Sequence, residues 1–513
     1  MLTPQDIKQL EDKGISELQF ETQMEYFKKG FPYINLAGAA NVGEGIVRLS
    51  DSDIENFAKI YEKQSGELSM IKFVPASGAA SRMFKDLIDV ALKYDKTEDK
   101  SAFKDIINCL DKVEKLALAK DLEKVLQKAG LDLNTLLSEK KYSTIAHYIL
   151  DKEGLGYQYK PKAMLLFHKY ATKSGIYEAR TAFEEHLVEG VHYAKMCDGT
   201  VRLHFTISPE HRSLFEEKIK EVVPALEERF GVRYEINFSE QMGKTDMVAL
   251  DKNGELVRNA DGTILFRPGG HGALIENLNA LEADLIFIKN IDNVTTDALR
   301  DKTYLYKKAL AGYLIYVQDN IKRCMLKLES LSLDDYSLSQ IEGFAAKVLN
   351  VHFSMTYFGR SKRERITYLI RKLNRPVRVC GMVRNEGEPG GGPYWVRKEN
   401  GHKHLQIIEA SQIDFTNPFQ VEMVQKSSHF NPVDLICGVR NYKGNKFNLK
   451  NYVDPKTGFI SQKKQNGIEM TIQELPGLWN GSMADWNTIF VEVPIETFTP
   501  VKTLADLLRR EHQ

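Results

Sequence analysis

The stretch TILFRPGGHGALIENLNALEADLIFIKNIDNV, residues 263–294, decides the fold class of this chain. It contains an apolar start, a glycine-rich turn, a helix-length segment and a second apolar run that ends at Asn290-Ile291-Asp292-Asn293. We therefore expect a strand, a turn, a helix and a strand with a carboxylate at its carboxyl end. Ligands of open α/β sheets lie at the carboxyl ends of strands and at helix N-termini. The stretch predicts a phosphate-handling enzyme whose Mg²⁺ ligand is Asp292. Taken singly, Asp292 is better explained as a helix cap or turn former.

Helices and strands alternate on both sides of this stretch. Apolar runs at residues 201–207, 232–238, 263–266 and 283–289 predict strands between helical segments. Such alternation is typical of an α/β fold, a Rossmann-like and mostly parallel sheet flanked by helices. We expect a helical segment at 1–68, the first half of a core at 69–300 with a helical insertion at about 86–158, a second helical segment at 301–371, and the other half of the core at 372–513.

The composition excludes several classes of protein. The 513 residues carry 70 Lys and Arg against 70 Asp and Glu, a balance that does not favour nucleic acid as a partner. The five cysteines are scattered without a CxxC spacing, which favours reduced thiols over disulfides or structural zinc. No apolar run approaches the roughly 20 residues of a membrane helix. We expect a cytoplasmic protein that does not span a membrane.

A second candidate motif is VPASGAASRMFK, residues 74–85. An apolar strand runs into a turn of small residues, so that the backbone N–H groups of Ala76, Ser77 and Gly78 can approach phosphate oxygens closely. Arg82 and Lys85 would balance the phosphate charge. The alternative is a tight turn between a strand and a helix in which small residues merely fit a crowded position.

Three further candidates stand elsewhere in the chain. The glycines of Gly270-His271-Gly272 allow a close backbone approach to a base or phosphate, although a plain glycine loop is the alternative. Lys162 precedes an apolar stretch, and Lys502 stands beside a helix start at Thr503. Taken singly, each lysine is as well explained as an ordinary surface residue or a cap.

Taken in order along the chain, these motifs resemble the nucleotide-sugar pyrophosphorylases and, in the middle of the chain, their UDP-sugar branch. ASGAASRM is similar to the glycine-rich loop of that family, and Pro161-Lys162 to its Pro-Lys pair. The resemblance implies a glycosyltransferase-A-type nucleotidyltransferase fold. It also implies that Gln241 and His271 lie near the base and that Lys502 contacts phosphate.

The same resemblance implies a metal site and a set of substrates. Asp292 would hold Mg²⁺, and Asp434, in HFNPVDL, would be a second ligand. The substrates would be a nucleoside triphosphate, with UTP favoured, and a sugar 1-phosphate, and the product pyrophosphate. The breaker-rich loop 385–393 is a candidate sugar contact or lid, or else a solvent-exposed hairpin; its candidate contact residues are Asn385, Glu386, Gly387 and Glu388.

The overall order of motifs, including RTAFEEHL, HFTISPEH and NEGEPGGGPYW, is most similar to a bacterial family of nucleotidyltransferase-like proteins, DUF4301. Two other functions stay open. Ala79, Ala80 and Ser81 stand where pyrophosphorylases usually have Gly and Thr, which would fit a non-catalytic protein that binds nucleotides or nucleotide sugars. A glycosyltransferase on the same fold would usually carry an Asp-x-Asp pair, whereas Asn290-Ile291-Asp292 offers one carboxylate.

Overall fold

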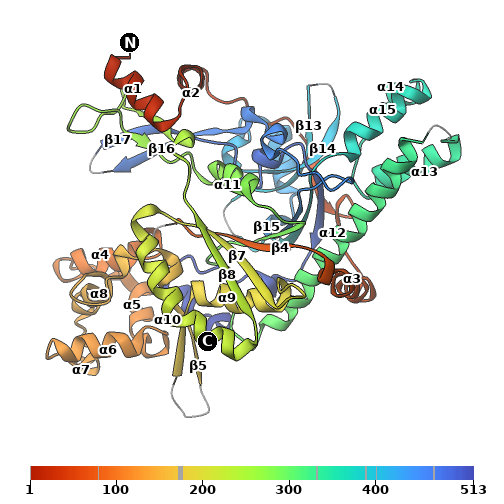
Figure 1. Ribbon diagram of the computed structural model, residues 1–513. Coiled ribbons are helices and arrows are strands. Elements are labelled where there is room, and N and C mark those ends of the chain that lie inside the picture. The colour runs from red at the N-terminus through yellow and green to blue at the C-terminus, as the bar shows by residue number, and fades with distance from the viewer. Residues whose placement is uncertain are drawn as a thin grey trace. The chain divides into compact units, whose positions relative to one another are not determined.

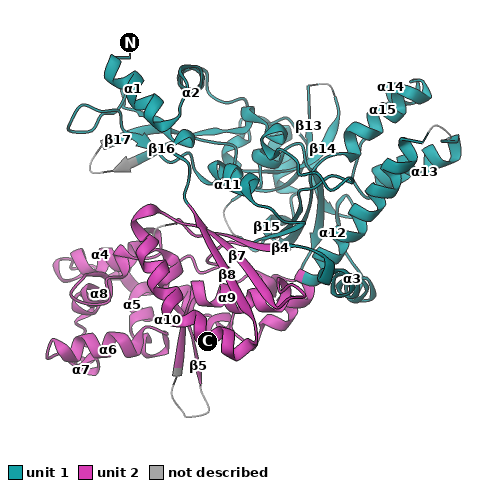
Figure 2. Cartoon of the chain, viewed as in Figure 1, with its two compact units in different colours: residues 1–70, 240–288, 308–493 teal, residues 71–239, 289–307, 494–513 magenta. Residues whose placement is uncertain are grey.

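The chain forms two compact units in the computed structural model (Figure 2). The structure describes residues 2–78, 80–171, 177–330, 333–387, 390–399, 401–465 and 468–513. Unit 1 comprises residues 1–70, 240–288 and 308–493, and unit 2 comprises residues 71–239, 289–307 and 494–513. Each unit therefore collects stretches that are far apart in the sequence, as the colours of Figure 1 show.

Unit 1 is built on a mixed sheet in the order β2-β3-β18-β12-β15-β11. The pairs β2–β3, β3–β18 and β18–β12 are parallel, whereas β15 runs antiparallel to both β12 and β11. The strands are β2 Asn41–Val42, β3 Gly45–Val47, β11 Leu285–Ile288, β12 Val377–Arg384, β15 His429–Gly438 and β18 Asn487–Glu492. The residues of β11 are fully buried, which explains its continuous apolar sequence.

Two smaller sheets and most of the helices complete unit 1. The orders are β1-β13-β14 and β10-β9-β17-β16. Their strands are β1 Leu36–Ala39, β13 Gly392–Arg397, β14 Lys403–Ile408, β9 Met247–Leu250, β10 Phe266–Arg267, β16 Phe459–Gln465 and β17 Ile468–Glu474. The helices are α1 Pro4–Lys13, α2 Glu17–Lys29, α3 Asp51–Gln64, α11 Leu274–Ala280, α13 Asp335–Lys347, α14 Met355–Phe358, α15 Lys362–Leu373 and α16 Pro418–Gln425. The longest helix, α12 Arg300–Leu328, has residues 300–307 in unit 2 and the others in unit 1.

Unit 2 contains the parallel strands β4-β7-β8 and a set of helices (Figure 1). The strands are β4 Met70–Pro75, β7 Thr200–Thr206 and β8 Arg233–Ser239, with a separate hairpin of β5 Leu166–Ala171 and β6 Tyr177–Thr181. The helices are α4 Lys85–Lys93, α5 Lys104–Leu110, α6 Ala119–Lys128, α7 Leu133–Ser138, α8 Tyr142–Leu150, α9 Ala182–Tyr193 and α10 Arg212–Phe230. One hydrophobic core joins the strands, the helices and the C-terminal residues Val501, Leu504 and Leu507.

Local sequence explains where many of these helices begin. Thr3, Ser16, Ser50, Thr181 and Ser361 each cap a helix with the hydroxyl, while the side chain three residues later closes the capping box. Pro4 follows the Thr3 cap at the first position of α1, where its missing N–H group costs no hydrogen bond.

A glycine decides how closely two helices of unit 1 approach. A Cβ atom on Gly312 of α12 would lie 1.8 Å from the carbonyl oxygen of Phe57 in α3. Only a residue without a side chain allows this contact.

The α/β class, the helical insertion and the mostly parallel arrangement of the principal strands are confirmed. Two details of the prediction are wrong. The expected strand at 263–266 shortens to β10, which pairs antiparallel with β9 in a separate small sheet. The segment 1–68, expected to be helical, also contains β1 and β2. Among the described residues, no helix is both long and apolar enough to cross a membrane.

Candidate active site

Four separate stretches of the sequence meet around Asp292 in unit 2. The N–H group of Lys162 donates to the carbonyl of Gly78 at 3.4 Å, which ties the Pro-Lys pair to the small-residue turn. The N–H group of Val501 donates to the carbonyl of Asp292 at 2.9 Å, which ties the C-terminal stretch to the 290–293 turn. The structure therefore brings together Gly78, Lys162, Asp292 and Lys502, four residues predicted separately.

The Asp292 carboxylate is held by two ammonium groups. The Nζ atom of Lys502 lies 2.8 Å from Asp292 Oδ2, and the Nζ atom of Lys162 lies 3.1 Å from the same oxygen. Lys162 also donates to the carbonyl of Val501 at 3.0 Å. The exposed side-chain fractions are 10% for Asp292, 14% for Lys162 and 60% for Lys502, so that Lys502 is the group free to follow a ligand.

Charge decides the protonation state of this carboxylate. Burial by itself raises the pKa of Asp292, but the positive charges of Lys502 and Lys162 outweigh burial and lower the pKa below its usual value. Asp292 is therefore ionised at neutral pH. Two cations on one anion leave a net positive site, which is suited to an incoming phosphate.

Buried groups that sequence reasoning missed hold the chain just before Asp292. The ring nitrogen Nε2 of His186, on α9, lies 3.2 Å from the carbonyl oxygen of Ile291, and burial lowers the pKa of His186 well below its usual value. Lys289 Nζ lies 2.8 Å from Glu189 Oε1, and Lys72 Nζ lies 3.0 Å from Glu189 Oε2. The sequence signal was a charged residue inside the apolar strand β4, at Lys72, and another directly after the apolar strand β11, at Lys289.

The small-residue turn that follows β4 is exposed to solvent at Ser77 and Gly78. Ala76 is fixed by its N–H group, which donates to the carbonyl of Thr206 at 2.9 Å, whereas Ser77 and Gly78 are exposed. Arg82 and Lys85 are exposed as well, at the end of a short 3-10 turn and at the start of α4. Ala79 lies outside the described residues.

The glycines around His271 serve packing within unit 1. A Cβ atom on Gly272 would lie 2.1 Å from the carbonyl oxygen of Pro476, and Gly270 has a φ of +78°. His271 is half-buried, accepts the N–H group of Leu478 on Nδ1 at 3.1 Å and contacts the Trp479 ring. Contact of this loop with a base stays a prediction.

The other predicted residues also lie in unit 1. Gln241 Nε2 donates to Asp246 Oδ1 at 3.5 Å. Asp434 is buried on β15, where it pairs with Gly381 of β12. Asn385 accepts the N–H group of Gly387 at 2.8 Å, a local turn, and Glu386 is exposed, while Glu388 lies outside the described residues. Their functional roles stay predictions.

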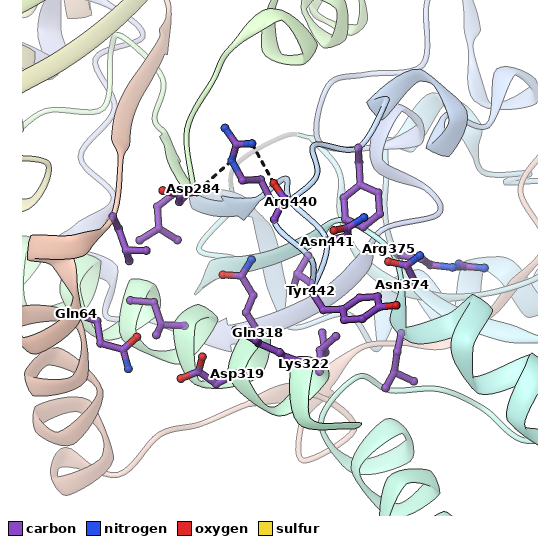
Figure 3. Close-up of a pocket in the computed structure, with 18 residues that line it drawn as sticks. Gln64, Asp284, Gln318, Asp319, Lys322, Asn374, Arg375, Arg440, Asn441 and Tyr442 are labelled. Atoms are coloured by element: carbon purple, nitrogen blue, oxygen red, sulfur yellow. Dashed lines mark hydrogen bonds and ion pairs between the residues drawn. The ribbon is translucent and has the colours of Figure 1, made fainter. Parts of the chain in front are cut away.

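No group of three or more His, Cys, Asp or Glu side chains is placed to hold a metal ion in the part of the chain that the structure describes. A pocket of about 290 Å³ in unit 1 lies apart from the predicted residues (Figure 3). Its Arg440 is paired with Asp284, Nε to Oδ1 at 3.1 Å, and with Glu282, Nη2 to Oε2 at 2.8 Å, so the charge of Arg440 is already balanced.

Solved structures with a related chain trace are UDP-sugar pyrophosphorylases. A mutant of UDP-glucose pyrophosphorylase from Leishmania major in complex with UDP-glucose has a TM-score of 0.43 at 12% identity, over 99% of this chain and 79% of that chain. A UDP-N-acetylglucosamine pyrophosphorylase from Trypanosoma brucei has a TM-score of 0.47 at 13% identity, over 96% and 76%. A putative UDP-N-acetylglucosamine pyrophosphorylase from Entamoeba histolytica has a TM-score of 0.43 at 10% identity, over 91% and 82%. TM-scores below 0.5 do not establish a shared activity.

No curated protein matches the sequence. The sequence profile of one family, described as a domain of unknown function, matches residues 3–513. The chain belongs to the DUF4301 family.

Proposed function

We propose that the protein is a nucleotidyltransferase that transfers a nucleotidyl group from a nucleoside triphosphate, UTP being favoured, to a sugar 1-phosphate and releases pyrophosphate. One observation carries the proposal. Lys162 and Lys502 converge on a single buried carboxylate, Asp292, beside the exposed turn at Gly78. The resemblance to the pyrophosphorylases implies phosphate contact for Lys502, the family's Pro-Lys pair for Lys162 and Mg²⁺ binding for Asp292.

The reaction needs little covalent help from the protein. A phosphate oxygen of the sugar 1-phosphate forms a bond to the α-phosphorus, and the bond from that phosphorus to the oxygen bridging to the β-phosphate breaks. Such transfers depend on positioning and on neutralising charge. In this proposal Lys162 and Lys502 turn from Asp292 to the oxygens around the α-phosphate, and the exposed Arg82 and Lys85 take the β- and γ-phosphates.

Asp292 fits a Mg²⁺ ion that is shared with the substrate. Mg²⁺ in proteins is commonly held by one or two carboxylates together with substrate phosphates, and the ionised Asp292 supplies one such ligand. Bound there, the ion would neutralise charge on the phosphates. Asp434 as a second ligand, Gln241 and His271 at the base, and Asn385, Glu386, Gly387 and Glu388 at the sugar complete the proposal.

We also propose a cytoplasmic location. The five cysteines are free thiols in the structure, three of them buried, which suits a reducing compartment.

Binding and chemistry are tested separately. Thermal unfolding is first followed with UTP, CTP, ATP or GTP and with their nucleotide sugars, with and without Mg²⁺. A ligand at a hundred times its Kd adds about 2.7 kcal/mol of stability, a rise of a few degrees in Tm. Pyrophosphate release is then measured with the nucleotide that binds and a panel of sugar 1-phosphates.

Variants connect the activity to the site. Asp292→Asn should stay folded and lose turnover, and Lys162→Met should lose roughly 10²–10³ in kcat, as removal of one charge-stabilising group typically does. Lys220→Met removes a charge from the exposed face of α10 and should leave kcat unchanged. Full activity of Asp292→Asn would remove Asp292 from the mechanism. Nucleotide binding without pyrophosphate release would favour the non-catalytic binder, and release of the sugar from a nucleotide sugar would favour a glycosyltransferase.

A further inference from the structure

A small polar pocket in unit 1 has a composition unlike the rest of the molecule. Its volume is about 170 Å³, several times the roughly 30 Å³ of a water molecule. We refer to it as the β14–β18 pocket. Its basic and indole-bearing lining residues are His352, Lys372, Arg375, Lys398, His402, Lys403, His404 and Trp486.

The pocket lies at the amino-terminal ends of parallel strands. Val377, the first residue of β12, pairs with Asn487, the first residue of β18, and Asn487 lines the pocket together with Thr488. Ligands of α/β sheets ordinarily lie at the carboxyl ends of the strands. All lining residues belong to unit 1, whereas Lys162, Asp292 and Lys502 belong to unit 2. The pocket is therefore not part of the candidate active site.

Positive charge in the pocket exceeds negative charge. Lys372, Arg375, Lys398 and Lys403 line it, and Asp485 is the one acidic side chain among its described lining residues. Asp485 already pairs with Lys398, and Arg375 Nη1 lies 3.6 Å from its Oδ1 atom. One carboxylate thus balances four half-buried cations.

The cations disfavour one another's charge. Burial, with Arg375 and Lys398 nearby, lowers the pKa of Lys372 to about 8. Burial, with Lys398 nearby, lowers the pKa of His404 to about 3. Burial is the larger cause of both shifts, and the neighbouring cations add to it.

Trp486, one of the lining residues, has a buried donor without an acceptor. The Trp486 side chain belongs to a residue that is 4% exposed, and its Nε1–H group makes no hydrogen bond with the described residues. A buried N–H group without a partner is costly and rare in native proteins. An oxyanion in the pocket would be attracted by the positive charges of Lys372 and Arg375.

We propose that the β14–β18 pocket binds one phosphate group, either inorganic phosphate or the phosphate of a small ester. The pocket is below the volume usual for larger organic ligands, which restricts the bound part to a group of this size. The proposal does not depend on the proposed transferase activity.

The test uses the full-length protein and inorganic phosphate. Tm is measured against phosphate, and against chloride at matched ionic strength, for the wild type, Lys372→Met, Trp486→Phe and Arg363→Met. Arg363 is exposed on α15 and does not line the pocket. Arg363→Met therefore removes one positive charge from the helix that carries Lys372, but outside the pocket. Phosphate should raise the Tm of the wild type and of Arg363→Met, and at least tenfold more phosphate should be needed for the same rise in Lys372→Met.

A second readout separates binding from a structural role. Without phosphate, Lys372→Met should unfold at a higher temperature than the wild type, because it removes a charge that its neighbours disfavour. The protein has three tryptophans, and their fluorescence can be followed as phosphate is added. A change in fluorescence that is lost in Trp486→Phe would place the phosphate near Trp486, in the β14–β18 pocket. Lys162→Met should retain the phosphate response, which excludes binding at Asp292.

Glycerol 2-phosphate identifies the source of the anion. Tighter binding than inorganic phosphate would indicate an ester, and weaker binding would indicate the free ion. Equal phosphate responses in the wild type and Lys372→Met, or no response beyond that to chloride, would overturn the proposal.

Discussion

Lys162 and Asp292 stand 130 residues apart in the sequence, yet Lys162 Nζ lies 3.1 Å from Asp292 Oδ2. Lys162 is bonded at both ends, since its backbone N–H group donates to the carbonyl of Gly78 and its ammonium group contacts Asp292 and Val501. The pair therefore links the small-residue turn to the turn that follows β11.

Asp292→Asn should lower stability near pH 7 by about 1–3 kcal/mol, because it leaves the mostly buried Lys162 without its counter-charge. The loss stays below the 3–5 kcal/mol of a fully buried pair, since Lys502 is 60% exposed. The pKa of Asp292 is lowered in the folded state, so its contribution is present above the unfolded value and is lost as pH falls through the folded value. Urea unfolding of the wild type and of Asp292→Asn should show a difference in the free energy of unfolding that is smaller at pH 3 than at pH 7. A constant difference would contradict this prediction.

Glu189→Gln should be far more damaging than Lys72→Met. The substitution leaves the buried Lys72 and Lys289 without an anion and should cost about 3–5 kcal/mol. Glu216→Gln, at an exposed ion pair on α10, should change stability by less than about 0.5 kcal/mol and serves as the control. Urea unfolding at pH 7 provides the comparison.

The pH dependence of Lys72 provides an independent check. Burial lowers the pKa of Lys72 to about 7, whereas the unfolded chain titrates near 10.5. Between these values the unfolded state binds more protons, so stability rises with pH through this group. The stability of the wild type minus that of Lys72→Met should increase between pH 7 and pH 10. A constant difference would show that Lys72 stays charged as the partner of Glu189 throughout this range.

His204 should contribute to the loss of folding stability in acid. Burial lowers its pKa to about 4, against about 6.5 in the unfolded chain, while its ring stacks on Phe73 and bonds to Ser239 Oγ at 2.7 Å. Its contribution is complete above pH 6.5 and is lost as pH falls toward 4. His204→Gln should have a flatter dependence of Tm on pH over that interval. Parallel curves for the two proteins would rule out His204 as the source.

Two glycine substitutions should change the free energy of unfolding in opposite directions. Gly272→Ala places a Cβ atom 2.1 Å from the Pro476 carbonyl oxygen and should cost about 1–3 kcal/mol through overpacking. Gly343→Ala, on α13 with no atom within 4 Å of the added Cβ, should stabilise by about 0.5–1 kcal/mol. Thermal unfolding of the two variants checks both. A stable Gly272→Ala would mean that the loop shifts freely and is available for a ligand.

Sequence reasoning worked best where local periodicity was decisive. The expected strands at 201–207 and 232–238 correspond to β7 and β8 within one residue. The pairing of β10 was wrong because a short apolar run carries no information about its partner. His186 and Glu189 were missed because α9 is buried on nearly all sides, which hides two functional polar side chains within an ordinary helical pattern.

The sequence by itself determined the α/β class, the helix starts and the residue types at each candidate turn. These features depend on sterics, capping and periodicity among neighbours in the chain. Only the tertiary structure decided that Lys162 and Lys502 share one oxygen of Asp292, and that Lys372, Arg375, Lys398 and Lys403 line one pocket. Lys502 and Asp292 are 210 residues apart, and such contacts arise from how buried elements pack. No local pattern encodes that packing.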